Sequence, residues 1–60
     1  MSLPKDPFML LSYINTQLRD NYASLTELAS SLGEDEEAIK AALENAGFEY
    51  NSELNRFAAK

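Results

Sequence analysis

The sequence has no cysteine, no histidine and no tryptophan, and only two glycines and two prolines among its 60 residues. Without cysteine there is neither a disulfide framework nor a thiolate metal site, so packing and helix capping must supply the stability. Without histidine or cysteine, nucleophiles activated by an imidazole are excluded, and no glycine-rich loop that could hold a phosphate is present. We therefore expect a protein that is not an enzyme and that uses no cofactor or metal.

Positive charge is also scarce, since ten acidic and only five basic side chains give a formal net charge of -5. A chain with this balance is repelled by phosphate backbones and by anionic lipid surfaces. We expect no nucleic-acid partner and no membrane contact. The sequence has no apolar run that could cross a membrane, and residues 1–6 lack the features of a secretory signal. These absences predict a cytoplasmic protein.

What remains is the composition of one ordinary small domain, because 45% hydrophobic residues are too many for a disordered tail. A chain of this length buries only about 60% of the surface that its unfolded form exposes, so the core is thin. We interpret residues 1–60 as a single domain in which residues 1–6 form an N-terminal arm.

The first helix is predicted over residues 7–22. Asp6 followed by Pro7 is typical of a helix start, because Asp caps free N–H groups and Pro suits the first helical position. Apolar side chains then recur at the helical period and form one broad arc that should face the core. The members of that arc are Phe8, Leu10, Leu11, Ile14, Leu18 and Tyr22. Asn15 falls inside the arc, and we predict that it satisfies a backbone group of the C-terminal segment.

Two shorter helices are predicted over residues 24–32 and 35–46. The first of them begins with a capping box, in which Ser24 accepts from the backbone of Glu27 and the Glu27 side chain reaches back to Ser24. Gly33 is predicted to end that helix in the left-handed conformation. The residues of the other helix that we expect to face the core are Ala38, Ile39, Ala42, Leu43 and Ala46.

The four consecutive acidic residues Glu34-Asp35-Glu36-Glu37 could indicate a calcium site, because carboxylate oxygens bind calcium. The run lacks the alternating ligand spacing, the central glycine and the distal glutamate of a calcium-binding loop. Acidic side chains in a first helical turn are stabilised by the helix dipole. We interpret the run as helix capping, with Asp35 as the cap, and predict no metal site.

Residues 48–59 alternate apolar and polar side chains around a turn, a pattern typical of a β-hairpin. With residues 52–55 as the loop, Tyr50 opposes Phe57, and Phe48 opposes Ala59 on the same face. A lone hairpin is only marginally stable in water, so this aromatic face must lie on the helices. The predicted fold is mainly α (α+β): a three-helix domain closed by a C-terminal β-hairpin.

The segment Leu28-Ala29-Ser30-Ser31-Leu32-Gly33, with Gly47-Phe48 further on, resembles a helix-turn-helix followed by the small wing of a winged-helix domain. This resemblance implies a winged-helix-like shape and, as an alternative function, a diverged DNA-binding protein. A helix that reads the major groove supplies Arg, Lys, Asn or Gln to base edges. Residues 34–44 instead carry five acidic side chains against Lys40 alone. We therefore predict the shape without binding to duplex DNA.

Several segments spread over nearly the whole chain carry a second resemblance. They are Leu3-Pro4-Lys5-Asp6-Pro7, Met9-Leu10-Leu11-Ser12, Asn15 with Leu18-Arg19-Asp20, and Gly47-Phe48-x-Tyr50 with Glu53, Asn55 and Phe57. Through them the chain is similar to short bacterial proteins catalogued as domain-of-unknown-function family 4250. The resemblance implies an uncharacterised, free-standing bacterial protein, and it transfers no functional residue.

The back of the first helix carries Met9 and Tyr13, four residues apart and opposite the core arc, with Gln17 beside them. Two explanations remain open: the N-terminal arm at residues 3–4 covers this stripe, or the stripe binds a protein. Our hypothesis is a non-enzymatic protein-interaction or regulatory module. It would bind another protein, or itself as a homodimer, through these three residues.

Overall fold

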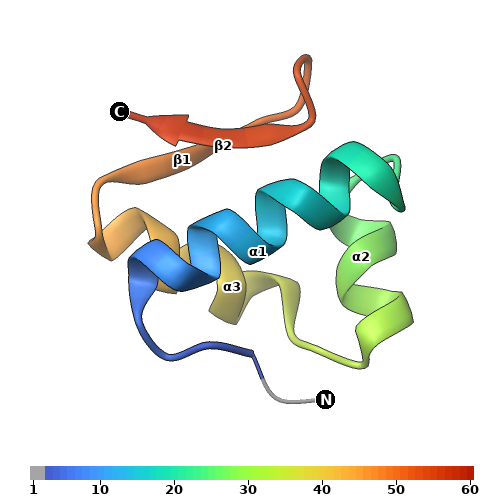
Figure 1. Ribbon diagram of the computed structural model, residues 1–60, viewed down its shortest axis with the longest axis horizontal. Coiled ribbons are helices and arrows are strands. Elements are labelled where there is room, and N and C mark those ends of the chain that lie inside the picture. Colours follow the sequence, from blue (N-terminus) through green and yellow to red (C-terminus); the bar gives the residue numbers. More distant parts are fainter. Residues whose placement is uncertain (1–2) are drawn as a thin grey trace.

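The computed structural model describes residues 3–60, in which three helices are followed by a two-stranded antiparallel hairpin (Figure 1). The elements are α1 (Pro7–Asp20), α2 (Leu25–Leu32), α3 (Glu36–Asn45), β1 (Phe48–Asn51) and β2 (Arg56–Ala59). In Figure 1 the hairpin forms one layer and the helices lie beneath it. The predicted fold class, mainly helical α+β with a C-terminal hairpin, is confirmed. Residues 1–2 of the predicted arm lie outside the described residues.

The helix starts follow the predicted caps. The Asp6 carboxylate accepts from the backbone N–H of Phe8 at 2.9 Å, and that of Asp35 accepts from Glu37 at 3.0 Å. Each bond satisfies one of the N–H groups that a first helical turn leaves without a partner. The predicted ranges 24–32 and 35–46 included the capping residues Ser24 and Asp35, so the helices themselves begin one residue later.

The capping box at the start of α2 is formed in part as predicted. Ser24 Oγ accepts from the backbone N–H of Glu27 at 3.1 Å, but the Glu27 carboxylate accepts from Ala23, also at 3.1 Å, rather than from Ser24. The chain is extended at Ser24 (φ -157, ψ 162), which brings the preceding amide to the carboxylate. Gly33 ends α2 in the left-handed region (φ 69), as predicted.

The prediction that the first helix continues to residue 22 is wrong, because α1 ends at Asp20. Asn21 leaves the helical region (φ -126, ψ -23), and the N–H of Tyr22 bonds to the carbonyl of Gln17 at 3.1 Å. The same carbonyl also accepts from the N–H of Asn21 at 2.8 Å, so both amides that follow α1 bond to Gln17. Similarly, α3 ends at Asn45, one residue before its predicted end.

The core is one cluster drawn from all three helices and from β2. Its buried members are Leu10, Ile14, Leu18, Leu25, Leu28, Ala29, Ile39, Leu43 and Phe57. Three core assignments are wrong: Phe8 is 64% exposed, and Ala38 and Ala42 are exposed. Only the row of Ile39 and Leu43 on α3 is buried. The rings of Phe8 and Phe48 are nearly perpendicular, at 85°, with their centroids 6.0 Å apart.

The hairpin has the predicted register, with Tyr50 opposite Phe57 and Phe48 opposite Ala59. The Phe57 side chain is almost fully buried, and its ring centroid lies 5.4 Å from that of Tyr50. Phe48 and Tyr50 are half-buried and pack on the core. Ala59, at the end of the strand, is exposed, so the buried aromatic face is shorter than predicted. This packing on the helices supplies the support that an isolated hairpin lacks.

Candidate functional site

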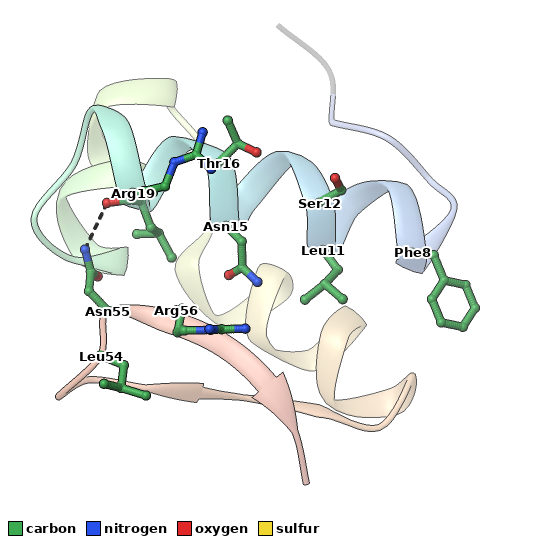
Figure 2. Close-up of a pocket in the computed structure, with 10 residues that line it drawn as sticks. Phe8, Leu11, Ser12, Asn15, Thr16, Arg19, Leu54, Asn55 and Arg56 are labelled. Carbon is green, nitrogen blue, oxygen red and sulfur yellow. Dashed lines mark hydrogen bonds between the residues drawn. The ribbon is translucent and has the colours of Figure 1, made fainter.

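A groove of about 720 Å³ runs between α1 and residues 54–56, at the tip of the hairpin and the start of β2 (Figure 2). One wall is a face of α1 from Phe8 to Arg19, and the other is formed by Leu54, Asn55 and Arg56. The two walls are more than 30 residues apart in the sequence, so only the tertiary structure brings them together.

Asn15 joins the two walls by holding the backbone of β2. Its Nδ2 donates to the carbonyl of Phe57 at 3.0 Å, and its Oδ1 accepts from the N–H of the same residue at 2.8 Å. The amide side chain thus takes the place of a neighbouring strand at this edge of the hairpin. The prediction that Asn15 satisfies a backbone group of the C-terminal segment is confirmed, and it satisfies two.

Asn55 fastens the tip of the hairpin to the end of α1. Its backbone is left-handed (φ 53), and its Nδ2 donates to the carbonyls of Leu18 and Tyr22 at 3.1 and 3.0 Å. Its Oδ1 accepts from the hydroxyl of Tyr50 at 2.6 Å, and that hydroxyl accepts from the N–H of Leu25 at 3.3 Å. Asn55 therefore caps α1 and fixes the loop at once. The sequence signal was an Asn in a turn, a residue that tolerates positive φ.

Two large apolar side chains are exposed at opposite ends of the groove. Phe8 and Leu54 are each 64% exposed, and the half-buried Leu11 lies on the α1 wall between them (Figure 2). Helical periodicity predicts Phe8 in the core, and Leu54 is predicted only as part of the hairpin loop; the exposure of Phe8 contradicts the first prediction. The groove therefore combines apolar contact area with open access.

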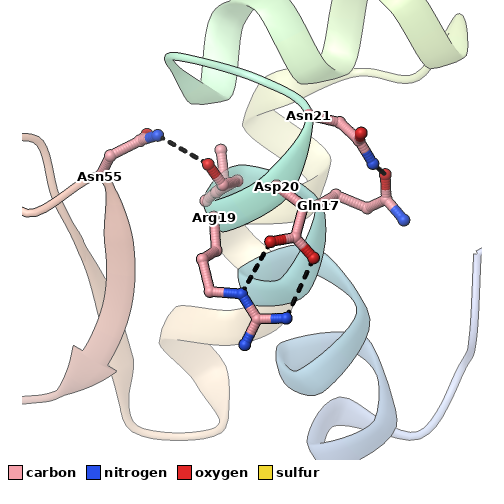
Figure 3. A network of polar contacts seen from close by, with 6 residues as sticks. Gln17, Arg19, Asp20, Asn21 and Asn55 are labelled. Carbon is pink, nitrogen blue, oxygen red and sulfur yellow. Dashed lines mark hydrogen bonds and ion pairs between the residues drawn. The ribbon is translucent and has the colours of Figure 1, made fainter.

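Two arginines bring positive charge to the same groove. Arg19 donates from Nε and Nη2 to both carboxylate oxygens of Asp20, at 2.9 and 3.0 Å (Figure 3). These hydrogen bonds raise the pKa of the Arg19 guanidinium and lower the pKa of the Asp20 carboxyl. Arg56 has no ion pair within residues 3–60. No carboxylate lines the groove.

The three residues predicted to bind a partner lie outside the groove lining and in different environments. Met9 is 61% exposed. Tyr13 is half-buried and packs against the core cluster, and the half-buried Gln17 accepts from Nδ2 of Asn21 at 2.8 Å (Figure 3). The arm residue Leu3 also packs against the core. The Met9, Tyr13 and Gln17 surface stays a prediction, with Met9 as its most accessible member.

The exposed side of α3 offers little positive charge. Glu37 and Glu44 are exposed there, while Lys40 is half-buried and Glu36 accepts from the Thr26 hydroxyl at 2.9 Å. A phosphate backbone placed against this helix would meet more carboxylates than cations. Within residues 3–60 the structure has no group of three or more acidic side chains that could hold a metal ion. None of the helices described here is long and apolar enough to span a membrane.

Comparison with known protein families gives a match over most of the chain. A family model described as "Domain of unknown function (DUF4250)" matches residues 4–57, which include both walls of the groove. No curated protein and no solved structure matches the chain. The groove residues must therefore be interpreted from their own chemistry.

Proposed function

The chain belongs to the DUF4250 family, whose description names no activity, and from its geometry we propose that it is a small, non-enzymatic protein-binding module. The proposed binding surface is the groove between α1 and residues 54–56. A protein partner would insert apolar side chains against Phe8 and Leu54.

The observation that carries this proposal is the exposure of Phe8 and Leu54 in one groove. Single exposed apolar residues are common on soluble proteins and need no explanation. Full burial of a side chain of this size is favourable by about 1.5–3 kcal/mol, so a partner that covers both gains a useful part of its affinity here. Exposed apolar residues that share one concave surface favour a binding site.

The rigidity of the groove supports the same function. Asn15 and Asn55 hold the hairpin against α1 through hydrogen bonds to three different residues, Phe57, Leu18 and Tyr22. A surface that is already ordered loses less conformational entropy when it binds. The groove is therefore suited to bind without rearrangement of its backbone.

The lining argues against catalysis. It offers hydroxyls, amides and guanidinium groups, and it has no histidine, cysteine or carboxylate that could act as a general base at neutral pH. Ser12 and Thr16 are exposed hydroxyl groups of the lining without such a base among the lining residues. Their nucleophilic activation would need one. Binding is the function that this set of groups supports.

The test is selection of a displayed library of random dodecapeptides on the immobilised protein. Peptides that bind the wild-type protein should lose affinity by about tenfold or more for the double variant Phe8→Ala with Leu54→Ala, because the apolar contact is removed. Met9→Ala is the matched control, since Met9 is equally exposed but outside the groove lining. Circular dichroism and urea unfolding establish that all three proteins are folded.

Two outcomes would contradict the proposal. If no peptide is enriched, or if enriched peptides bind the double variant as well as the wild type, the groove is not the binding surface. Loss of binding in Met9→Ala alone would instead support the Met9, Tyr13 and Gln17 surface. Sedimentation equilibrium of the same proteins tests self-association, because a homodimer that the double variant dissociates would place a second copy in the groove.

A further inference from the structure

We infer that the partner segment held in the groove is acidic: a short stretch with an apolar side chain near Phe8 and carboxylates at Arg19 and Arg56. This inference rests on the proposed function, because it names the chemistry of the peptide that occupies the same groove. It is carried by the distribution of charge and by the geometry of the two guanidinium groups.

The groove has positive charge available on a protein that is negative overall. The chain carries ten acidic and five basic side chains, yet two arginines and no carboxylate line the groove. Asp20, just outside the lining, offsets the charge of Arg19, and Arg56 has no ion pair within residues 3–60. An acidic segment is repelled by most of the surface and attracted here. Complementary potentials of this kind select the binding site and the orientation of a partner more than they add raw affinity.

Both arginines can accept a carboxylate. Arg56 is exposed, and all its donors are free of protein partners in the part of the chain that the structure describes. Arg19 donates from Nε and Nη2 to Asp20, which leaves Nη1 for a ligand. A guanidinium is planar and forms short, charge-assisted hydrogen bonds with carboxylates.

The length of the groove limits the segment. Phe8 and Arg19 are eleven positions apart on one helix, which corresponds to about 16 Å along its axis. An extended peptide covers that distance with about five residues. The apolar and the acidic part of the segment should therefore lie within one short motif.

Two other occupants fit the groove less well. In a symmetric dimer the same surface of both copies meets, so the lining of a second groove would offer arginines and no carboxylate to Arg56. A nucleic acid needs many cations along its backbone, and beyond the two arginines the net charge of the chain opposes it. An acidic protein segment can bind the arginines through its carboxylates and cover Phe8 and Leu54 with its apolar side chains.

The composition of the peptides selected on the wild-type protein is the first test. We expect enrichment of Asp and Glu within about five positions of Leu, Ile, Phe or Met. The most enriched peptide is then synthesised with a fluorescein label, together with a counterpart in which every Asp becomes Asn and every Glu becomes Gln. Fluorescence anisotropy should show about tenfold weaker binding of the amide counterpart.

Charge variants of the protein provide the second test. Arg56→Glu should weaken binding of the acidic peptide by about tenfold or more, because an attractive contact becomes a repulsive one. Lys60→Glu is the matched control: it changes the net charge by the same amount at an exposed position outside the groove lining. It should change the affinity by less than about twofold at about 150 mM salt, where distant charges are screened.

The results separate this inference from the proposed function. Enriched peptides without Asp or Glu that still depend on Phe8 and Leu54 would refute the acidic segment and leave the protein-binding function intact. Equal effects of Arg56→Glu and Lys60→Glu would also refute it. A labelled mixed-sequence single-stranded DNA that binds at the same salt concentration and is lost in Arg56→Glu would assign the arginines to nucleic acid. No enriched peptide at all would overturn both proposals.

Discussion

Asn15 is the residue whose replacement tests most directly how the groove is built. Its side chain makes two hydrogen bonds to the backbone of Phe57, a residue that is 1% exposed. Asn15→Ala removes both and leaves an N–H and a carbonyl of β2 without their partner. Asn15→Asp keeps the shape of the side chain and replaces the donating amide by a carboxylate oxygen.

The expected magnitude follows from the two bonds. Each contributes about 0.5–1.5 kcal/mol net, and a buried polar group left without a partner costs about 1–3 kcal/mol. Asn15 borders the open groove, so water can reach part of the vacated site. We expect Asn15→Ala to lower the free energy of unfolding by about 2–3 kcal/mol. A domain of 60 residues has about 3–9 kcal/mol in total, so the loss is a large fraction of its stability.

Asn15→Asp should respond to pH. The ionised carboxylate accepts from the Phe57 N–H but cannot donate to the Phe57 carbonyl, whereas the protonated form does both. The folded state therefore raises the pKa of this carboxyl above its unfolded value of about 3.9. Its stabilising contribution is complete below the unfolded pKa and is lost as the pH rises through the folded pKa. The variant should be closest to the wild type in acid and least stable at neutral pH.

Urea unfolding followed by circular dichroism measures both effects at about pH 4, 5.5 and 7. The difference between variant and wild type is taken at each pH, so that pH effects common to both proteins cancel. Thr16→Ala is the control, an exposed neighbour on the same helix, and should change stability by less than about 0.5 kcal/mol. A loss below about 1 kcal/mol for Asn15→Ala, or a deficit of Asn15→Asp independent of pH, would refute this reasoning.

Three further predictions concern the stability of the fold, and all are measured by urea unfolding. Leu43→Ala should cost about 2–5 kcal/mol because Leu43 is 0% exposed, and a loss below about 1 kcal/mol would contradict its place in the core. Gly33→Ala should cost about 1–2 kcal/mol from its φ of +69° alone, since an added Cβ meets nothing within 4 Å; an unchanged stability would contradict this backbone argument. Asn55→Gly keeps the left-handed conformation but loses the hydrogen bonds to the Leu18 and Tyr22 carbonyls. It should lower the free energy of unfolding by about 1–3 kcal/mol, and an increase in stability would mean that these bonds contribute nothing.

Local chemistry made most of the architecture predictable. The N-caps at Asp6, Ser24 and Asp35 follow from the need of a first helical turn for acceptors, and the stop at Gly33 follows from its left-handed backbone. The register of the hairpin followed from the alternation of its side chains, because a slip of one residue would expose Phe57. These rules act over a few residues, so they can be applied to the sequence directly.

Asn15 shows that one long-range contact was also predictable. A polar side chain enclosed by apolar neighbours is usually retained to satisfy a backbone group, and the C-terminal segment was predicted to supply that group. Which residue it binds, and that both backbone groups of Phe57 are involved, was known only from the structure.

The groove could not be predicted, because it depends on how much of the α1 surface the neighbouring segments cover. Helical periodicity gives the angle of a side chain around the axis, and by that measure Phe8 belongs to the core arc. It is 64% exposed because, within residues 3–60, its one ring contact is with Phe48, and the rest of its surface is left largely open. Ala38 and Ala42 were misassigned for the same reason. Helical periodicity does not show how wide a part of a helix's apolar face is covered by the elements packed on it.

The charge, the helices, the hairpin and the need of Asn15 for a partner follow from composition or from neighbours along the chain, so they could be derived from the sequence alone. The position of Leu54 and Arg56 opposite Phe8 and Arg19, more than 30 residues away in the chain, is a result of tertiary packing. The hydrogen bonds of Asn15 and Asn55 hold these two segments together. A local sequence pattern does not reveal that the two segments are close in space. A binding surface made of two distant segments exists only once such bonds have formed.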